Sequence, residues 1–241
     1  GPYFLNVWDF PFVQAYPAIF AGRDDGVSLW GITDNKRFKY QIGAFDGTNG
    51  TTTSNQKDNL LYAGRVTYNF WDPEPAIYYN QSTYYGDIDV LAIGFAGMVQ
   101  QDGAGTATVS GDYASWNVDF LLEKKLPSNG VVTLEAAYYD YDLDNLGSID
   151  SRGLAEGDSW LAVASYLCPK KLGWGQVQPV FRYQEFDRTA GGTQERYDIG
   201  ANYIISGHNA KLSAIYSNDD DPSLGINNVD RFKLGLQLQL F

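Results

Sequence analysis

Residues 230–241 read DRFKLGLQLQLF, and this segment decides the fold class. Between residues 231 and 240, apolar side chains occupy the even positions, namely Phe232, Leu234, Leu236, Leu238 and Leu240. Charged or polar side chains and one glycine occupy the odd positions, namely Arg231, Lys233, Gly235, Gln237 and Gln239. Because successive side chains of a β-strand point to opposite faces, this period of two predicts a strand with one apolar and one polar face.

The same division recurs along the chain in segments of about ten residues, the length that a tilted strand needs to cross a bilayer. It predicts eleven strands, at 27–32, 37–45, 59–70, 88–100, 113–123, 131–142, 159–167, 176–186, 195–205, 210–217 and 230–241. Val180 is an exception, because it is an apolar residue on the otherwise polar face of its strand.

The connections between these segments alternate in length. Short turns are predicted at 33–36, 124–130, 168–175 and 206–209. Longer polar loops are predicted at 46–58, 101–112, 144–158, 187–194 and 218–229. Short turns at one end and long loops at the other are typical of outer-membrane barrels. Residues 71–87 break the rule, because they form a long connection on the short-turn side.

Periodicity alone does not say which face points inward, but three features favour apolar residues outside. The opposite face is rich in Gln, Asn, Ser and Gly, which suit a wet interior, and eleven strands exceed the small soluble barrels. Aromatic residues gather at strand ends, as membrane interfaces require. They include Tyr68, Phe70, Trp116, Tyr138, Trp160, Tyr183, Tyr203 and Tyr216.

These features predict an all-β chain that forms a transmembrane antiparallel β-barrel in the bacterial outer membrane, in contact with membrane lipid and lipopolysaccharide. No run of 18 apolar residues is present, which excludes a transmembrane helix. Residues 1–241 are expected to form a single barrel domain. Because bacterial barrels have even strand numbers, eleven strands predict an N-terminally incomplete barrel. Residues 1–26 are expected to be a long extracellular or inward-folded loop.

The composition and motifs argue against several classes of function. The net charge of −12 argues against a nucleic-acid partner, since phosphate binding needs clustered Lys and Arg. The chain has one histidine, His208, in a predicted turn, and one cysteine, Cys168. It lacks Gly-x-Ser-x-Gly, multi-histidine and Cys-x-x-Cys-His patterns. No enzyme, no metal site and no cofactor is therefore expected.

The charged residues of the polar face give the selectivity candidates. The basic candidates are Lys39, Arg65, Arg182, Arg196, Lys211, Arg231 and Lys233. The acids predicted on the same face are Asp119, Glu123, Glu135 and Asp198. Because selectivity follows local charge at the narrowest point, this balance predicts a preference for small anions or oxyanions. The alternative is that these bases pair with the acids and only brace the wall.

Several motifs resemble one family. Residues 22–31 read GRDDGVSLWG, 40–47 read YQIGAFDG and 208–212 read HNAKL. With the last strand, they are similar to the phosphate-selective porin O and P family. The resemblance implies an anion-preferring homotrimeric porin of about sixteen strands, of which about five lie upstream. It also implies a constriction built by an inward-folded loop and basic side chains. By position this loop includes residues 3–21, and the constriction candidates are Trp8, Phe10, Phe12 and Arg23.

Two other functions stay open at this point. One is a barrel scaffold that houses or docks an electron-transfer partner such as a multihaem cytochrome. The other is a narrow or plugged barrel that anchors a surface layer. The leading prediction is a porin that allows passive diffusion of small solutes.

Overall fold

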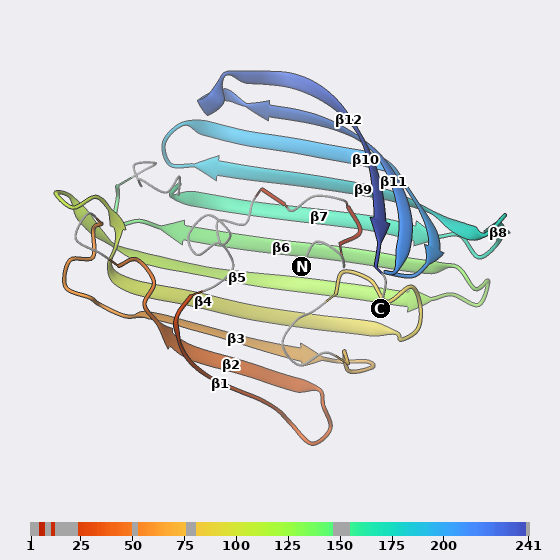
Figure 1. The fold of residues 1–241 in the computed structure, drawn as a ribbon, viewed down its shortest axis with the longest axis horizontal. Coiled ribbons are helices and arrows are strands. Elements are labelled where there is room, and N and C mark those ends of the chain that lie inside the picture. Colours follow the sequence, from red (N-terminus) through yellow and green to blue (C-terminus); the bar gives the residue numbers. More distant parts are fainter. Residues whose placement is uncertain are drawn as a thin grey trace.

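The chain folds into one antiparallel sheet whose strands follow the chain order (Figure 1). The computed structural model describes residues 5–7, 11–12, 24–49, 53–75, 81–146 and 155–239. The main path comprises β1 (Gly26–Ile32), β2 (Phe38–Phe45), β3 (Leu61–Asn69), β4 (Val90–Gly105), β5 (Ser110–Lys125), β6 (Val131–Asp142), β7 (Gly157–Leu167), β9 (Gly175–Arg188), β10 (Gly192–Ser206), β11 (Ala210–Asp221) and β12 (Ile226–Leu238). The two-residue strand β8 (Lys171–Leu172) pairs with β9 alone.

The all-β antiparallel prediction is confirmed, and the eleven main strands fall where the alternation places them. β6, for example, spans the predicted residues 131–142. The sheet does not close on itself: β1 and β12 are its two ends and each pairs with one neighbour in the described residues. The confirmed architecture is thus an open, curved sheet (Figure 1).

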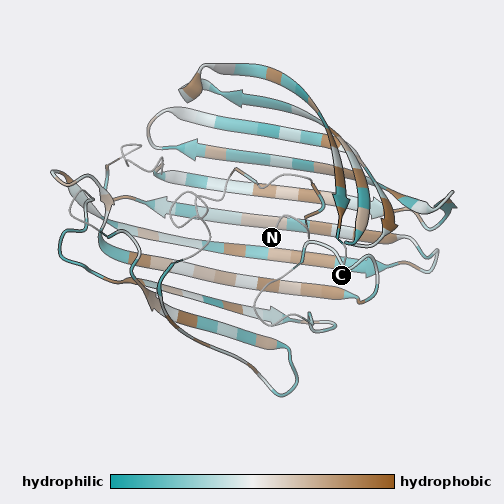
Figure 2. Cartoon of the chain, in the orientation of Figure 1, coloured by the Kyte–Doolittle hydropathy of each residue, from teal (hydrophilic) through white to brown (hydrophobic). Residues whose placement is uncertain are grey.

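The two faces of this sheet differ in polarity. On β12, Phe232, Leu234, Leu236 and Leu238 are 57–76% exposed. On β9, Phe181 is 43% exposed whereas its neighbour Arg182 is 2% exposed. We call the face that carries Arg182 the inner face and the opposite one the outer face. Charged residues are rarely buried in water-soluble domains, so this arrangement is the reverse of an ordinary hydrophobic core. Figure 2 shows the resulting alternation of apolar and polar residues along the strands.

Aromatic rings form a continuous row on the outer face, which we call the outer aromatic belt. It consists of Phe95, Trp116, Tyr138, Trp160, Tyr183, Tyr197 and Tyr216. Three of its tyrosines donate hydrogen bonds of 2.7–2.8 Å to carboxylates, namely those of Asp158, Glu185 and Asp230. An aromatic body with a hydrogen-bonded polar tip marks a boundary between apolar and polar surroundings.

The connections differ from the predicted alternation at three places. Only residues 106–109, 189–191 and 222–225 separate β4 from β5, β9 from β10 and β11 from β12. The long loops expected at 101–112, 187–194 and 218–229 are therefore wrong. These segments are hairpin extensions that carry polar residues on both faces, so hydropathy alternation does not reveal them as strands. Tight turns at their tips use left-handed residues such as Gly191 and Gly225.

No helix among the described residues is long and apolar enough to cross a membrane. The single helical element in them is a 3-10 turn at Pro222–Leu224.

Candidate functional site

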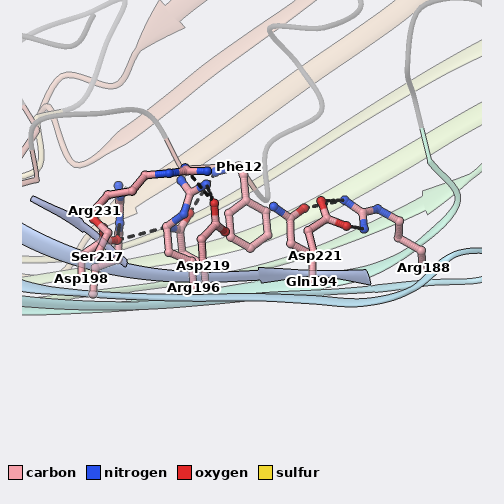
Figure 3. Close-up of polar contacts among 11 residues, drawn as sticks. Phe12, Arg188, Gln194, Arg196, Asp198, Ser217, Asp219, Asp221 and Arg231 are labelled. Carbon is pink, nitrogen blue, oxygen red and sulfur yellow. Dashed lines mark hydrogen bonds and ion pairs between the residues drawn. The ribbon is translucent and has the colours of Figure 1, made fainter. Parts of the chain in front are cut away.

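The inner face of β9 to β12 carries a ladder of paired charges (Figure 3). Arg182 Nε donates to Asp198 Oδ2 at 2.8 Å, and both side chains are almost fully buried. Asp219 accepts from Arg196 Nη2 at 2.7 Å and from Arg231 Nη1 at 2.9 Å. The antiparallel register places each arginine opposite or diagonal to its carboxylate. Because a buried charge is stable only when it is paired, these contacts fix the wall in one geometry.

A second pair crosses the sheet at β3 to β5. Arg65 donates two hydrogen bonds to Asp119, of 2.6 and 2.8 Å, in a bidentate fork. The strand between them, β4, has Gly94 at this level. A Cβ at Gly94 would lie 2.7 Å from both carboxylate oxygens of Asp119. Glycine is therefore required for the two side chains to meet above β4.

All seven basic residues predicted to line the pore lie on the inner face. Lys211 is 1% exposed and donates from Nζ to the backbone oxygen of Leu5 at 2.7 Å. Lys39 is also buried, whereas Lys233 on β12 is partly exposed. Four of the seven, namely Arg65, Arg182, Arg196 and Arg231, pair with carboxylates. Their placement agrees with the predicted face, and their role in selectivity stays a prediction.

Residues 5–7, near the N-terminus, lie against this inner face. Asn6 is 2% exposed and donates from Nδ2 to Glu135 Oε1 at 2.8 Å and to the backbone oxygen of Ser82 at 3.0 Å. It accepts from Gln178 at its side-chain oxygen and from Asn202 at its backbone oxygen. One asparagine thus joins the N-terminal segment to three strands and to the β3–β4 connection.

Apolar contacts hold the same segment. Val7 packs in a buried cluster with Leu161, Val163, Val180 and Ile215. Val180, the exception in the predicted polar face, is thereby explained, since the inner face has an apolar patch where the N-terminal segment sits. In the sequence, the apolar Val180 on an otherwise polar face is a sign of this contact.

Phe12 is the described member of the constriction-loop candidates. Its backbone nitrogen donates to Gln184 Oε1 at 2.9 Å. The guanidinium of Arg196 lies 5.1 Å from the centre of its ring (Figure 3), a distance suited to a cation–π contact. Trp8, Phe10 and Arg23 lie outside the described residues.

Residues 82–86 of the β3–β4 connection, which broke the predicted length rule, also contact the inner face. Their anchor is Glu123, whose buried carboxylate accepts from the hydroxyls of Thr83 at 2.6 Å and Thr133 at 2.9 Å. The backbone nitrogens of Tyr84 and Gly86 also donate to this carboxylate, at 3.1 and 2.8 Å. A carboxylate that gathers four donors holds the connection firmly in place. Sequence reasoning placed Glu123 on this face but did not foresee its partners.

The connection also carries a buried acid, Glu74. It accepts from the Tyr84 hydroxyl at 2.7 Å. Burial raises the pKa of the Glu74 carboxyl above its ordinary value, while the nearby charge of Lys39 acts in the opposite direction. His208 lies at the same end, where its Nε2 is 2.9 Å from the backbone oxygen of Thr83. The predicted turn histidine thus contacts the inserted connection.

Between these segments and the strands lies a cavity of about 530 Å³. Its charged lining consists of Arg65, Glu74, Asp119, Glu135 and Arg182. The two arginines engage carboxylates, and Glu135 accepts from Asn6. The cavity is therefore bounded by both apolar and charged residues, and its positive charges are locally compensated.

Comparison with protein-family models, with curated proteins and with solved structures finds no match. The resemblance to the phosphate-selective porin family accordingly stays a prediction. In the described part of the chain, no group of three or more His, Cys, Asp or Glu side chains is arranged to hold a metal ion.

Proposed function

We propose that the protein is an outer-membrane diffusion channel for small solutes, in which the inner face lines the aqueous path and the outer face contacts lipid. The observation that carries the proposal is the reversed polarity of the sheet, with Arg182 and Asp198 buried in one face and Leu234 and Phe232 exposed on the other. In a lipid bilayer, apolar side chains on the outer face carry no free-energy penalty. The polar side chains of the inner face stay hydrogen-bonded to one another or to water. The outer aromatic belt supports the proposal, because such rings favour the membrane–water interface.

The proposal includes barrel closure. The ends β1 and β12 each have one unpaired edge in the described sheet. Open backbone edges are strongly unfavourable in hydrocarbon, where no water satisfies them. In the membrane, further strands pair with these edges and close the barrel.

The N-terminal segment and the β3–β4 connection form the constriction of this channel. They meet at the hydrogen bond from Asn6 to Ser82 and leave the cavity beside them. A scaffold that houses a protein partner such as a cytochrome would need this space free, whereas the two segments occupy it. A diffusion path for small solutes therefore fits the inner face better.

Charge selectivity of this channel is expected to be weak. Five inner-face arginines have carboxylate partners, namely Arg65, Arg182, Arg188, Arg196 and Arg231. Pairing reduces the field that a passing anion meets, so the anion preference predicted from the charged residues of the polar face is proposed in this reduced form.

The proposal is tested by recording single channels of the purified protein in planar lipid bilayers. Discrete conductance steps carried by both chloride and potassium are expected. Insertion of the protein without any conductance would reject the channel and favour the anchoring alternative.

Changing Arg65 to glutamate tests the lumen assignment. The variant places two carboxylates face to face, since Asp119 loses its bidentate partner. We expect the anion-to-cation permeability ratio, taken from reversal potentials in a salt gradient, to fall by at least about fivefold, because a unit charge at 4 Å in water is worth roughly 1 kcal/mol. Lys57→Glu makes the same charge change at an exposed loop and should leave the ratio unaltered. Equal permeability ratios for the wild type and Arg65→Glu would show that Arg65 does not lie on the conducting path.

A further inference from the structure

The outer face of β9 to β12 is not smooth, but contains an apolar groove of about 500 Å³. One row of paired residues forms its wall near the β10–β11 turn, namely Val177, Tyr203, Leu212 and Leu236. The next row consists of Ala201, Ala214 and Leu234. The groove exists because two alanines lie side by side between larger side chains. Rows two residues apart make it about 7 Å long along the strands, which suits a stretch of hydrocarbon chain.

A basic hairpin adjoins this groove. Residues 168–176 contain Lys170 and Lys171 and no acid, and both lysines are exposed. On the same hairpin Leu172 is 67% exposed and Trp174 is 86% exposed. Lysine and tryptophan together are the side chains that prefer the headgroup region of a membrane.

Tyr203 connects the hairpin to the groove. Its hydroxyl accepts from the backbone nitrogen of Gly175 at 2.9 Å and donates to the backbone oxygen of Leu172. Because Tyr203 is also part of the groove wall, these bonds fix the backbone of the hairpin that carries the lysines and Trp174 relative to the apolar surface. A charged end and an apolar slot are thereby held as one surface.

We propose that this surface binds one anionic phospholipid, with an acyl chain in the groove, the phosphate beside Lys170 and Lys171, and Trp174 at the headgroup level. The inference rests on the proposed function in one respect, that the outer face lies in a bilayer. The positive charge next to a largely apolar slot matches an amphiphile with a negative head. A second copy of this chain would instead have to bring acidic residues to the hairpin and a side chain to the groove.

The test is native mass spectrometry of the purified protein with phosphatidylglycerol and phosphatidylcholine of identical acyl chains. Phosphatidylglycerol is expected to bind about thirtyfold more tightly, the fold-change that corresponds to about 1 kcal/mol for each of two lysines at an anionic headgroup. The double variant Lys170→Ala/Lys171→Ala should bind both lipids equally. Ala201→Leu/Ala214→Leu should reduce the retention of both by filling the groove. The matched control is Ala162→Leu/Ala164→Leu, because these alanines alternate with the buried Leu161 and Val163 on β7 and lie outside the groove.

Three outcomes would overturn the site. The first is equal affinity of the wild type for the two lipids. The second is that Ala201→Leu/Ala214→Leu retains as much lipid as the wild type. The third is a dimer of the wild-type protein that is absent from Ala201→Leu/Ala214→Leu. Channel recordings of the same variants keep the two proposals separate. Lost lipid preference with normal conductance supports a lipid site distinct from the pore. Preferential retention of phosphatidylglycerol by a protein without conductance would support the site while rejecting the channel.

Discussion

Replacing Glu123 with alanine is expected to release the β3–β4 connection from the inner face and to raise the single-channel conductance several-fold. The carboxylate is fully buried and accepts from Thr83, Tyr84, Gly86 and Thr133. Alanine leaves these donors without their acceptor, and each buried donor left unsatisfied costs about 1–3 kcal/mol. The released connection loses its contacts with the wall, so the free energy of unfolding should also fall, by about 1–3 kcal/mol. Denaturant titration in lipid vesicles measures the change in the free energy of unfolding. Bilayer recording measures the change in conductance.

Glu123→Gln is the matched control for this variant. Glutamine keeps the side-chain length and one acceptor oxygen, so part of the hydrogen-bond set survives. Its conductance and stability should lie between those of the wild type and the alanine variant. If Glu123→Ala has wild-type conductance and wild-type stability, the connection is not held by this carboxylate and does not narrow the channel.

Replacing Leu134 with arginine tests what surrounds the outer face. Leu134 lies on β6, in the interior of the sheet, and is 40% exposed. It is four residues from Tyr138 of the outer aromatic belt and faces the same side. A charged side chain on the lipid face near the middle of a bilayer costs about 2–4 kcal/mol. An exposed position in a water-soluble protein would change by no more than about 0.5 kcal/mol. Reversible unfolding from lipid vesicles distinguishes the two values.

Val109→Arg provides the reference for that measurement. Val109 is 56% exposed but lies at the tip between β4 and β5, beyond the belt. The same substitution there should leave the free energy of unfolding within about 0.5 kcal/mol of the wild type. Equal, small effects at both positions would mean that water covers Leu134.

The strands were predictable because a single rule, alternation, governs every segment with one polar and one apolar environment. β6 and β12 obey it over most of their length. The rule fails where both faces carry polar residues, as at residues 187–194, which extend β9 and β10 into a hairpin. Whether the sheet closes was not accessible from periodicity, because closure depends on strand number, tilt and stagger across the whole sheet and not on any one strand.

The inner face was predictable in its residues but not in its partners. Period two assigned Arg65 and Arg182 to the polar face. It gave no register between strands, so it did not reveal that Gly94 makes room for the Arg65–Asp119 pair. The segments folded onto this face were harder still, since Asn6 contacts residues more than one hundred positions away. Two features of the sequence relate to these segments, namely the unusual length of the connection at residues 71–87 and the apolar Val180 on a polar face.

Spin labels along β12 give the most direct test of the central claim, that polar side chains face an aqueous interior and apolar ones face lipid. Single nitroxides are placed at each of residues 231–238 in a Cys168→Ser background, and the protein is reconstituted in vesicles. Collision rates are measured with oxygen, which concentrates in lipid, and with a water-soluble nickel complex. We expect oxygen contact to peak at 232, 234, 236 and 238 and nickel contact to peak at 231, 233, 235 and 237. The opposite phase, or equal nickel contact at all eight positions, would contradict the account.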